Sequence, residues 1–188
     1  MPVPSQNKTP VWSIAIRFFH WALVISIITA WVTHHGPGWL HDAAGYSVLV
    51  LIGFRLARSL FGKPAERFSR FVCGWKATTD YVRRLISGTE QRYLGHNPLG
   101  GWMIVALILT ATLTSLSGWL YVTDRYWGVE WVEDLHDGSA NLLLALIGIH
   151  VLGVIFTSFR QGENLAASMI HGEKARTTKK HPDAPREP

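Results

Sequence analysis

Four long apolar runs, separated by polar and charged segments, constrain the fold of this chain more than any other feature. They lie at roughly residues 13–33, 41–61, 98–122 and 135–159. Each run is longer than the about 18 residues that are typical of a membrane-spanning helix. The first run lacks a small-residue cleavage site, so it is expected to remain in the membrane as the first span. The pattern predicts an all-α, integral-membrane four-helix bundle.

Positive charge is distributed very unevenly around these runs. Of the 18 lysines and arginines, all but Arg125 lie at the chain ends or near the segment that joins the second and third runs. By the positive-inside rule, both termini and the segment at about 64–96 are expected in the cytoplasm, and the connections 34–40 and 123–134 outside. The same bias accounts for the net charge of +5. No nucleic-acid partner is therefore expected.

Local composition predicts the boundaries of the membrane domain. Residues 1–11 and 173–188 are polar and proline-rich, so both are expected to be disordered tails around a membrane domain at 12–172. Between the second and third runs, apolar and charged residues alternate with helical spacing in FSRFVCGWKATTDYVRRLI. An amphipathic segment on the cytoplasmic leaflet is expected there. Asn97 and Pro98 suit the N-cap and the first helical position, so the third span is expected to begin at Pro98.

Four histidines lie within or at the edge of the apolar runs. His136 and His150 are fourteen residues apart on the fourth run. On a helix, their side chains therefore point within about 40° of the same direction around the axis, and they are separated by about 21 Å along it. With cytoplasmic termini, His20 lies towards the inner end of its span, at the depth of His150. His41 lies towards the outer end, at the depth of His136. The sequence predicts two histidine pairs, one near each side of the membrane.

Two imidazoles at each depth suit the axial positions of a haem iron, whereas zinc needs three or four converging ligands. The chain has one cysteine, Cys73, and no C-x-x-C-H motif, so haem would be held without covalent links. Arg17, three residues before His20, and Arg55, fourteen residues after His41, are candidates for pairing with haem propionates. Arginines that only mark the inner boundary would lie in the same places.

Several further residues have a functional and an ordinary interpretation. Gly45, one turn after His41, would leave room for a porphyrin edge, and Gly118 would let a bulky group approach the third span. Simple helix packing would explain both glycines. His96, beside a helix start, is a candidate for capping or for contact with quinone or haem. The outer connections form either a solvated rim or a docking face for a basic partner. Their acidic residues are Asp42, Asp124, Glu130, Glu133, Asp134 and Asp137.

Motifs in all four runs resemble a known family. They are RFFHW (17–21), LHDAAGY (40–46), GHNPLGGWM (95–103) and LHDGSANLLLALIGIH (135–150). Over residues 12–172 the chain resembles the bacterial four-helix di-haem cytochrome b family. That family includes the prokaryotic cytochrome b561 proteins and the b-type cytochrome subunits of nickel–iron hydrogenases. GHNPLGG is similar to the hydrogenase-type branch.

The resemblance implies two non-covalent b haems, at His20/His150 and His41/His136. It also implies electron transfer between the quinone pool and a redox partner, with quinone as a further candidate cofactor. The expected location is the bacterial inner membrane, as a multi-pass protein. The expected partners are membrane lipid, a quinone or quinol, and a redox protein such as a soluble cytochrome c or a hydrogenase-like subunit. The chain would act alone as a cytochrome or as the quinone-reactive subunit of a larger oxidoreductase.

Two functions of other classes stay open from the residues alone. A proton or metal-ion transporter could use the four histidines as a relay, although every acidic residue lies near a surface. A haem-free membrane scaffold could dock partners through the acidic outer connections. Absorption spectra separate these functions from a cytochrome, because the transporter and the scaffold both predict a colourless protein.

Overall fold

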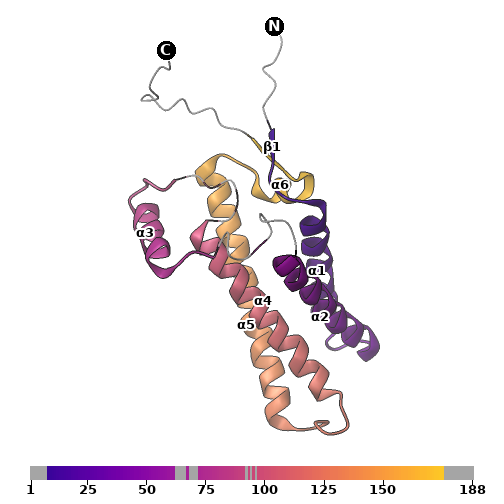
Figure 1. Ribbon diagram of the computed structural model, residues 1–188. Coiled ribbons are helices and arrows are strands. Elements are labelled where there is room, and N and C mark those ends of the chain that lie inside the picture. Colours follow the sequence, from indigo (N-terminus) through magenta and orange to yellow (C-terminus); the bar gives the residue numbers. More distant parts are fainter. Residues whose placement is uncertain are drawn as a thin grey trace, which may run out of the picture.

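The computed structural model describes residues 8–61, 67, 72–91, 93, 95 and 97–175 of the 188-residue chain. These residues form a helical bundle with one short ribbon of two strands (Figure 1). The helices are α1 (Ile14–Val32), α2 (Gly38–Phe61), α3 (Trp75–Ile86), α4 (Pro98–Tyr121), α5 (Glu130–Gln161) and α6 (Leu165–His171). The strands are β1 (Lys8–Pro10) and β2 (Glu173–Ala175).

The prediction of four membrane-spanning helices is confirmed. α1, α2, α4 and α5 are each long and apolar enough to cross a membrane. α4 begins as expected, because the Asn97 side chain accepts a hydrogen bond of 2.7 Å from the backbone N–H of Gly100 and Pro98 occupies the first turn.

Two of the spans begin earlier than the sequence predicted. α2 starts at Gly38 rather than at His41, because the carbonyl of Pro37 accepts hydrogen bonds from the backbone N–H groups of Leu40 and His41. The Gly-Pro-Gly turn therefore starts the helix instead of only breaking the chain. α5 starts at Glu130 rather than near residue 135, and its acidic first turn complements the positive end of the helix dipole.

Each of the four long helices packs against the next long helix along the chain. α1 lies against α2, α2 against α4, and α4 against α5, as Figure 1 shows. α1 and α5 are not among the extensively packed pairs of described elements. The buried core lies between α2, α4 and α5 and consists of Val48, Ile52, Ile108, Ala111 and Leu143.

The two chain ends meet in an antiparallel ribbon. β1 pairs with β2 in the register Lys8↔Ala175, Thr9↔Lys174 and Pro10↔Glu173. The prediction of disordered tails at 1–11 and 173–188 therefore differs from the structure at these six positions, while residues 1–7 and 176–188 lie outside the described part. The difference arises because backbone pairing, which leaves no side-chain pattern in such short segments, forms the ribbon.

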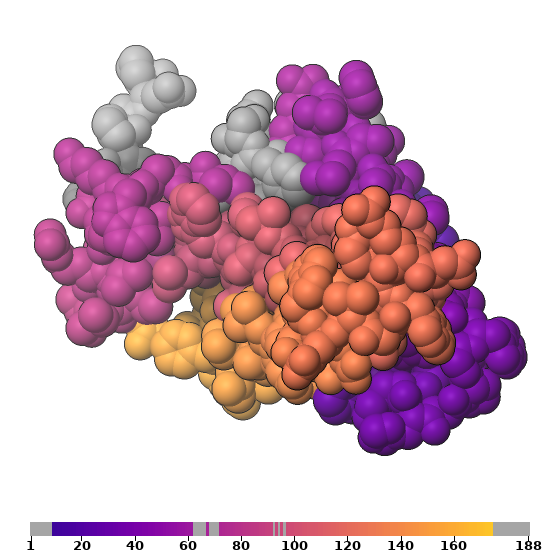
Figure 2. Space-filling view, turned by 90° about the horizontal axis from the view of Figure 1, so that it is seen from below, coloured from indigo at the N-terminus to yellow at the C-terminus, as the bar shows by residue number. Residues whose placement is uncertain are grey.

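The ribbon defines one end of the bundle, which we name the termini end (Figure 1). The opposite end, the turn end, carries the connections 33–37 and 122–129. Figure 2 views the molecule from the turn end and shows the start of α5 in orange next to the violet surface of the α1–α2 connection. The histidines are placed by their position relative to these two ends.

The predicted amphipathic segment between the second and third spans is confirmed as α3, which packs against α4 at the termini end (Figure 1). The first part of the predicted segment, residues 68–71, lies outside the described residues. Hydrogen bonds between Arg160 and Glu90 tie the chain after α3 to α5. Nε and Nη2 of Arg160 donate to Oε1 of Glu90 at 3.0 and 2.7 Å. These hydrogen bonds hold the pKa of the Glu90 carboxyl below its usual range.

Candidate cofactor sites between the helices

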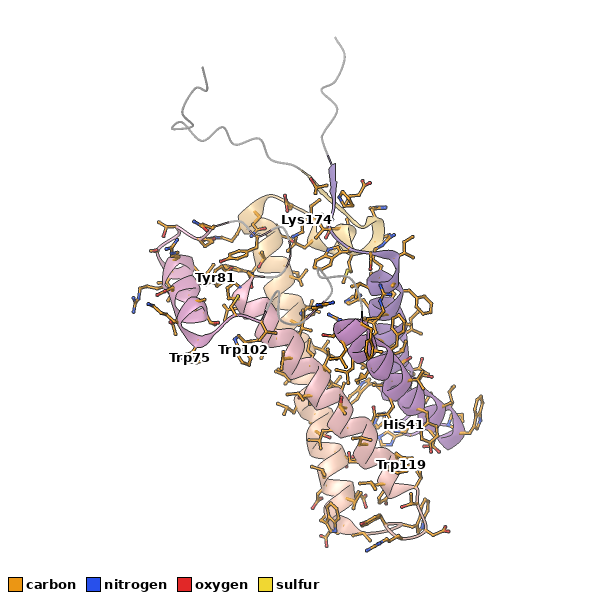
Figure 3. All side chains as sticks on the ribbon, viewed as in Figure 1. His41, Trp75, Tyr81, Trp102, Trp119 and Lys174 are labelled. Atoms are coloured by element: carbon orange, nitrogen blue, oxygen red, sulfur yellow. The ribbon has the colours of Figure 1, made fainter. Side chains whose placement is uncertain are left out.

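His41 and His136 face each other at the turn end. His41 belongs to the first turn of α2 and His136 to the second turn of α5. Their ring centroids are 6.0 Å apart, and the ring planes make an angle of 75°. Figure 3 labels His41 towards the end of the bundle at which α4 ends and α5 begins. The structure therefore brings together the two histidines that the sequence assigned to one depth.

Backbone carbonyls fix the orientation of both rings. Nδ1 of His41 donates to the carbonyl of Ala30 on α1 at 2.9 Å, and Nδ1 of His136 donates to the carbonyl of Thr114 on α4 at 2.9 Å. A carbonyl oxygen can only accept, so each Nδ1 carries the proton and each Nε2 keeps its lone pair. Two neutral imidazoles with free Nε2 atoms can bind one metal ion between them.

Gly118 allows His136 to lie against the backbone of α4. A Cβ atom added at Gly118 would be 2.8 Å from Cε1 and 3.0 Å from Nδ1 of His136, closer than such atoms pack. The expectation that a bulky group approaches the third span at this glycine now has a structural explanation, since the group is an imidazole. Ser139 further supports α5 here, because its hydroxyl donates to the carbonyl of His136 at 3.0 Å.

Gly45 lies one turn after His41 on α2, and its position is open. An added Cβ there would meet no atom within 4 Å. Tight helix packing is therefore not the reason for a glycine at this position. The expectation that a flat group uses room next to His41 stays a prediction.

The second predicted pair consists of His20 on α1 and His150 on α5. Nδ1 of His20 is buried without a hydrogen-bond partner, and the edge of the ring contacts Trp21, with centroids 5.2 Å apart. A buried polar atom without a partner is costly, so it marks a position that a further group is expected to stabilise.

The two predicted arginines occupy different environments. Nη1 of Arg17 donates to the carbonyl of Ile170 on α6, and its guanidinium lies against Gly172. The structure therefore directs Arg17 towards the chain ends rather than along the face of His20. Arg55 is 5% exposed on α2 and lies within the bundle. A charged side chain inside a membrane bundle is expensive and is usually functional.

Sequence reasoning missed the groups that hold the rings and the contact between the chain ends and α1. Nε1 of Trp21 donates to the carbonyl of Met169 at 3.3 Å, next to the bond between Arg17 and Ile170. His96 lies outside the described residues. Within the part of the chain that the structure describes, no three His, Cys, Asp or Glu side chains cluster to hold a metal ion. Of the two predicted histidine pairs, His41 and His136 have a ring contact, and the pairing of His20 with His150 stays a prediction.

Comparisons with known proteins give matches over most of the chain. A family model described as prokaryotic cytochrome b561 matches residues 11–172. The chain is 24% identical, over 219 aligned positions, to the probable Ni/Fe-hydrogenase B-type cytochrome subunit of Azotobacter vinelandii, and the alignment covers 90% of each protein. The protein of the same name from Azotobacter chroococcum mcd 1 is similar to the same extent.

Proposed function

The chain belongs to the prokaryotic cytochrome b561 family, and we propose that it transfers electrons across a membrane through two non-covalent b haems. His41 and His136 would bind one haem at the turn end. His20 and His150 would bind the other at the termini end. With four spans it is a multi-pass membrane protein.

The geometry of the turn-end pair is the observation that carries this proposal. Metal–imidazole bonds of about 2.0–2.1 Å place the centroids of two rings on opposite sides of one ion roughly 6 Å apart. The centroids of His41 and His136 are 6.0 Å apart. Both Nδ1 atoms are bonded to carbonyls, so both Nε2 atoms are free to face a metal. His41 and His136 would therefore suit as the two imidazole ligands of one haem iron.

At the termini end, the fit to haem depends on a different observation. The unpartnered Nδ1 of His20 and the absence of extensive packing between α1 and α5, among the described elements, support a site that closes around a bound group. Of the two predicted propionate partners, Arg55 is the better placed, because it is buried within the bundle. The guanidinium of Arg17 extends instead to α6 at the chain ends. We propose Arg55 as the cation for a propionate and Arg17 mainly as a support for the chain ends.

The protein has three tasks in this function. Haem iron, when bound, supplies the one-electron redox couple. The histidines fix the position of each iron, and the fourteen residues between His136 and His150 separate the two levels by about 21 Å along α5. The apolar helices exclude water, which tunes the reduction potential.

We further propose that the termini end faces the cytoplasm and that the membrane is the bacterial inner membrane. The strong bias of lysine and arginine towards the termini end supports this orientation. Electrons would pass to or from the quinone pool. Both relatives are named as hydrogenase cytochrome subunits, so a hydrogenase-like subunit is one proposed redox partner at the turn end. A basic soluble cytochrome c is the other, because the connections there are acidic.

Absorption spectra of the purified protein, oxidised and reduced with dithionite, test the proposal. A Soret shift and an alpha band are expected on reduction, and a pyridine haemochrome assay should return about two haems per chain. A colourless protein would refute the haem proposal and favour a transporter or a scaffold. A value near one haem would show that one of the two pairs does not bind.

A further inference from the structure

α3 has three chemically distinct faces. Tyr81 and Thr78 are buried towards the rest of the protein. Lys76, Arg83 and Arg84 are exposed along a polar side. The third face is apolar and exposed: its members include Trp75, 77% exposed, and Ile86, 83% exposed. A helix with one face on protein, one apolar and one cationic suits the boundary between a membrane and water.

The apolar face of α3 continues into a groove on α4. Trp75, Val82 and Ile86 of α3 and Leu99 and Trp102 of α4 line a groove of about 430 Å³. Figure 3 shows Trp75 and Trp102 next to each other where the two helices meet. Nε1 of Trp102 donates to the carbonyl of Cys73 at 3.1 Å, which attaches the chain before α3 to the first turn of α4. The groove is therefore held in shape by a hydrogen bond.

The groove has a cation on its wall and lies at a membrane boundary. Arg83 lines it together with the apolar side chains. Among the described residues, none forms an ion pair with Arg83. α4 is a membrane-spanning helix that begins at Pro98, so Leu99 and Trp102 lie in the first turns of a span. Tryptophan is enriched at this depth, where lipid headgroups meet acyl chains.

We propose that this groove binds one anionic phospholipid. An acyl chain would lie against Trp75, Val82 and Trp102, and the phosphate would pair with Arg83. A second groove of about 400 Å³ on α1 is also lined by an arginine, Arg17, but that guanidinium already donates to the carbonyl of Ile170. The α3–α4 groove is thus the one whose cation is available for a headgroup.

Native mass spectrometry of the full-length, haem-loaded protein tests the proposal. The protein is titrated in detergent with phosphatidylglycerol or with phosphatidylcholine, and retained lipids are counted. The wild type should retain one phosphatidylglycerol in preference to phosphatidylcholine. Arg83→Gln should weaken phosphatidylglycerol retention roughly fivefold, the effect of one cation near an anionic headgroup. Lys76→Gln, the same charge change on α3 but outside the groove lining, should change retention by less than about twofold.

Ile86→Ser tests the apolar wall. It should reduce retention of both lipids, whereas Leu109→Ser, an exposed position on α4 away from the groove, should not. Equal retention of the two lipids by the wild type, equal loss in the Arg83 and Lys76 variants, or a quinone retained in place of lipid would each overturn the proposal. Haem content is measured in the same samples. Because the lipid groove needs no haem, a colourless protein would refute the electron-transfer proposal without deciding this one.

Discussion

At the turn end, His41 and His136 each donate Nδ1 to a helix carbonyl, and their rings already face each other at 6.0 Å. At the termini end, Nδ1 of His20 is buried without a partner, and no ring contact joins it to His150 among the described residues. Carbonyls of α1 and α4 anchor the turn-end pair, and His136 packs against Gly118. At the termini end, α1 is attached to α6 by the hydrogen bonds of Arg17 and Trp21. The two ends therefore differ in how the protein holds its histidine rings.

Removal of single ligands gives the largest expected effect. His136→Ala and His150→Ala should each lower haem content from about two to about one per chain, since one axial ligand is lost in each. The two variants should also differ in whether amide hydrogen exchange in α1 increases. His150→Ala should increase hydrogen exchange in α1, and His136→Ala should not. A pyridine haemochrome assay and exchange mass spectrometry measure the two effects, and identical exchange in both variants would remove the difference between the ends.

Removal of both haems from the wild-type protein should show the same difference between the turn end and the termini end. In the apoprotein, amide exchange in α1 should rise more than in α2 and α4. α2 and α4 share the buried core, whereas α2 is the one described element on which α1 packs extensively. Addition of haem should restore the protection of α1. If α2 and α4 lost as much protection as α1, the two ends would depend on the cofactor equally.

Gly118→Ala should selectively disturb the turn-end site. The added Cβ would come within 2.8 Å of Cε1 of His136, so the ring must move away from the carbonyl of Thr114. Loss of such a supporting hydrogen bond typically lowers metal-site affinity by about 10–100-fold. Gly153→Ala is the matched control, because its added Cβ meets no atom within 4 Å. Electron paramagnetic resonance and redox titration should show one altered haem and one unchanged haem.

Trp21→Phe should weaken the attachment of α6 to α1 at the termini end. It removes the hydrogen bond from the indole to the carbonyl of Met169, which is worth about 1 kcal/mol. Proteolysis and amide exchange of residues 165–175 should increase, while the turn-end haem keeps its spectrum. Trp31→Phe, at the other end of α1, is the control and should leave that segment unchanged.

Lowering the pH should release the chain after α3 from α5. This effect is expected to be the smallest of those described. Arg160 lowers the pKa of Glu90, so the contact stabilises the folded state above the ordinary carboxyl pKa of about 4.3 and is lost as the pH falls through the lower, folded value. Exchange of residues 75–91 should rise on acidification. In Glu90→Gln it should already be higher at neutral pH and should respond less to acid. An unchanged acid response in this variant would assign the release to another group.

Periodicity in the sequence was enough to predict the four spans, α3 and the pairing of His41 with His136. These predictions depend on helix pitch and on depth in the membrane, and both follow from residue spacing. The carbonyls of Ala30 and Thr114 could not be predicted, because they depend on how each helix is rotated against its neighbours. Gly118 was noted as a small residue, but only packing of α4 on α5 reveals that His136 occupies the space.

Arg17 shows why proximity in sequence is a weaker guide for long side chains. It shares a helical face with His20, yet its guanidinium extends to Ile170, 153 residues away in the chain. A flexible arginine reaches several partners from one Cα position. The ribbon of β1 and β2 was also beyond prediction, since three-residue strands leave no alternating pattern.

Because Arg17 and Trp21 are bonded to residues near the far end of the chain, the first span leaves the ribosome long before its partners exist. At about 5–20 residues per second, the wait is on the order of ten seconds. During that interval the termini end of α1 lacks these two contacts. They can form only after residues 169 and 170 have been synthesised, so the attachment of α1 to α6 is expected to be a late folding step.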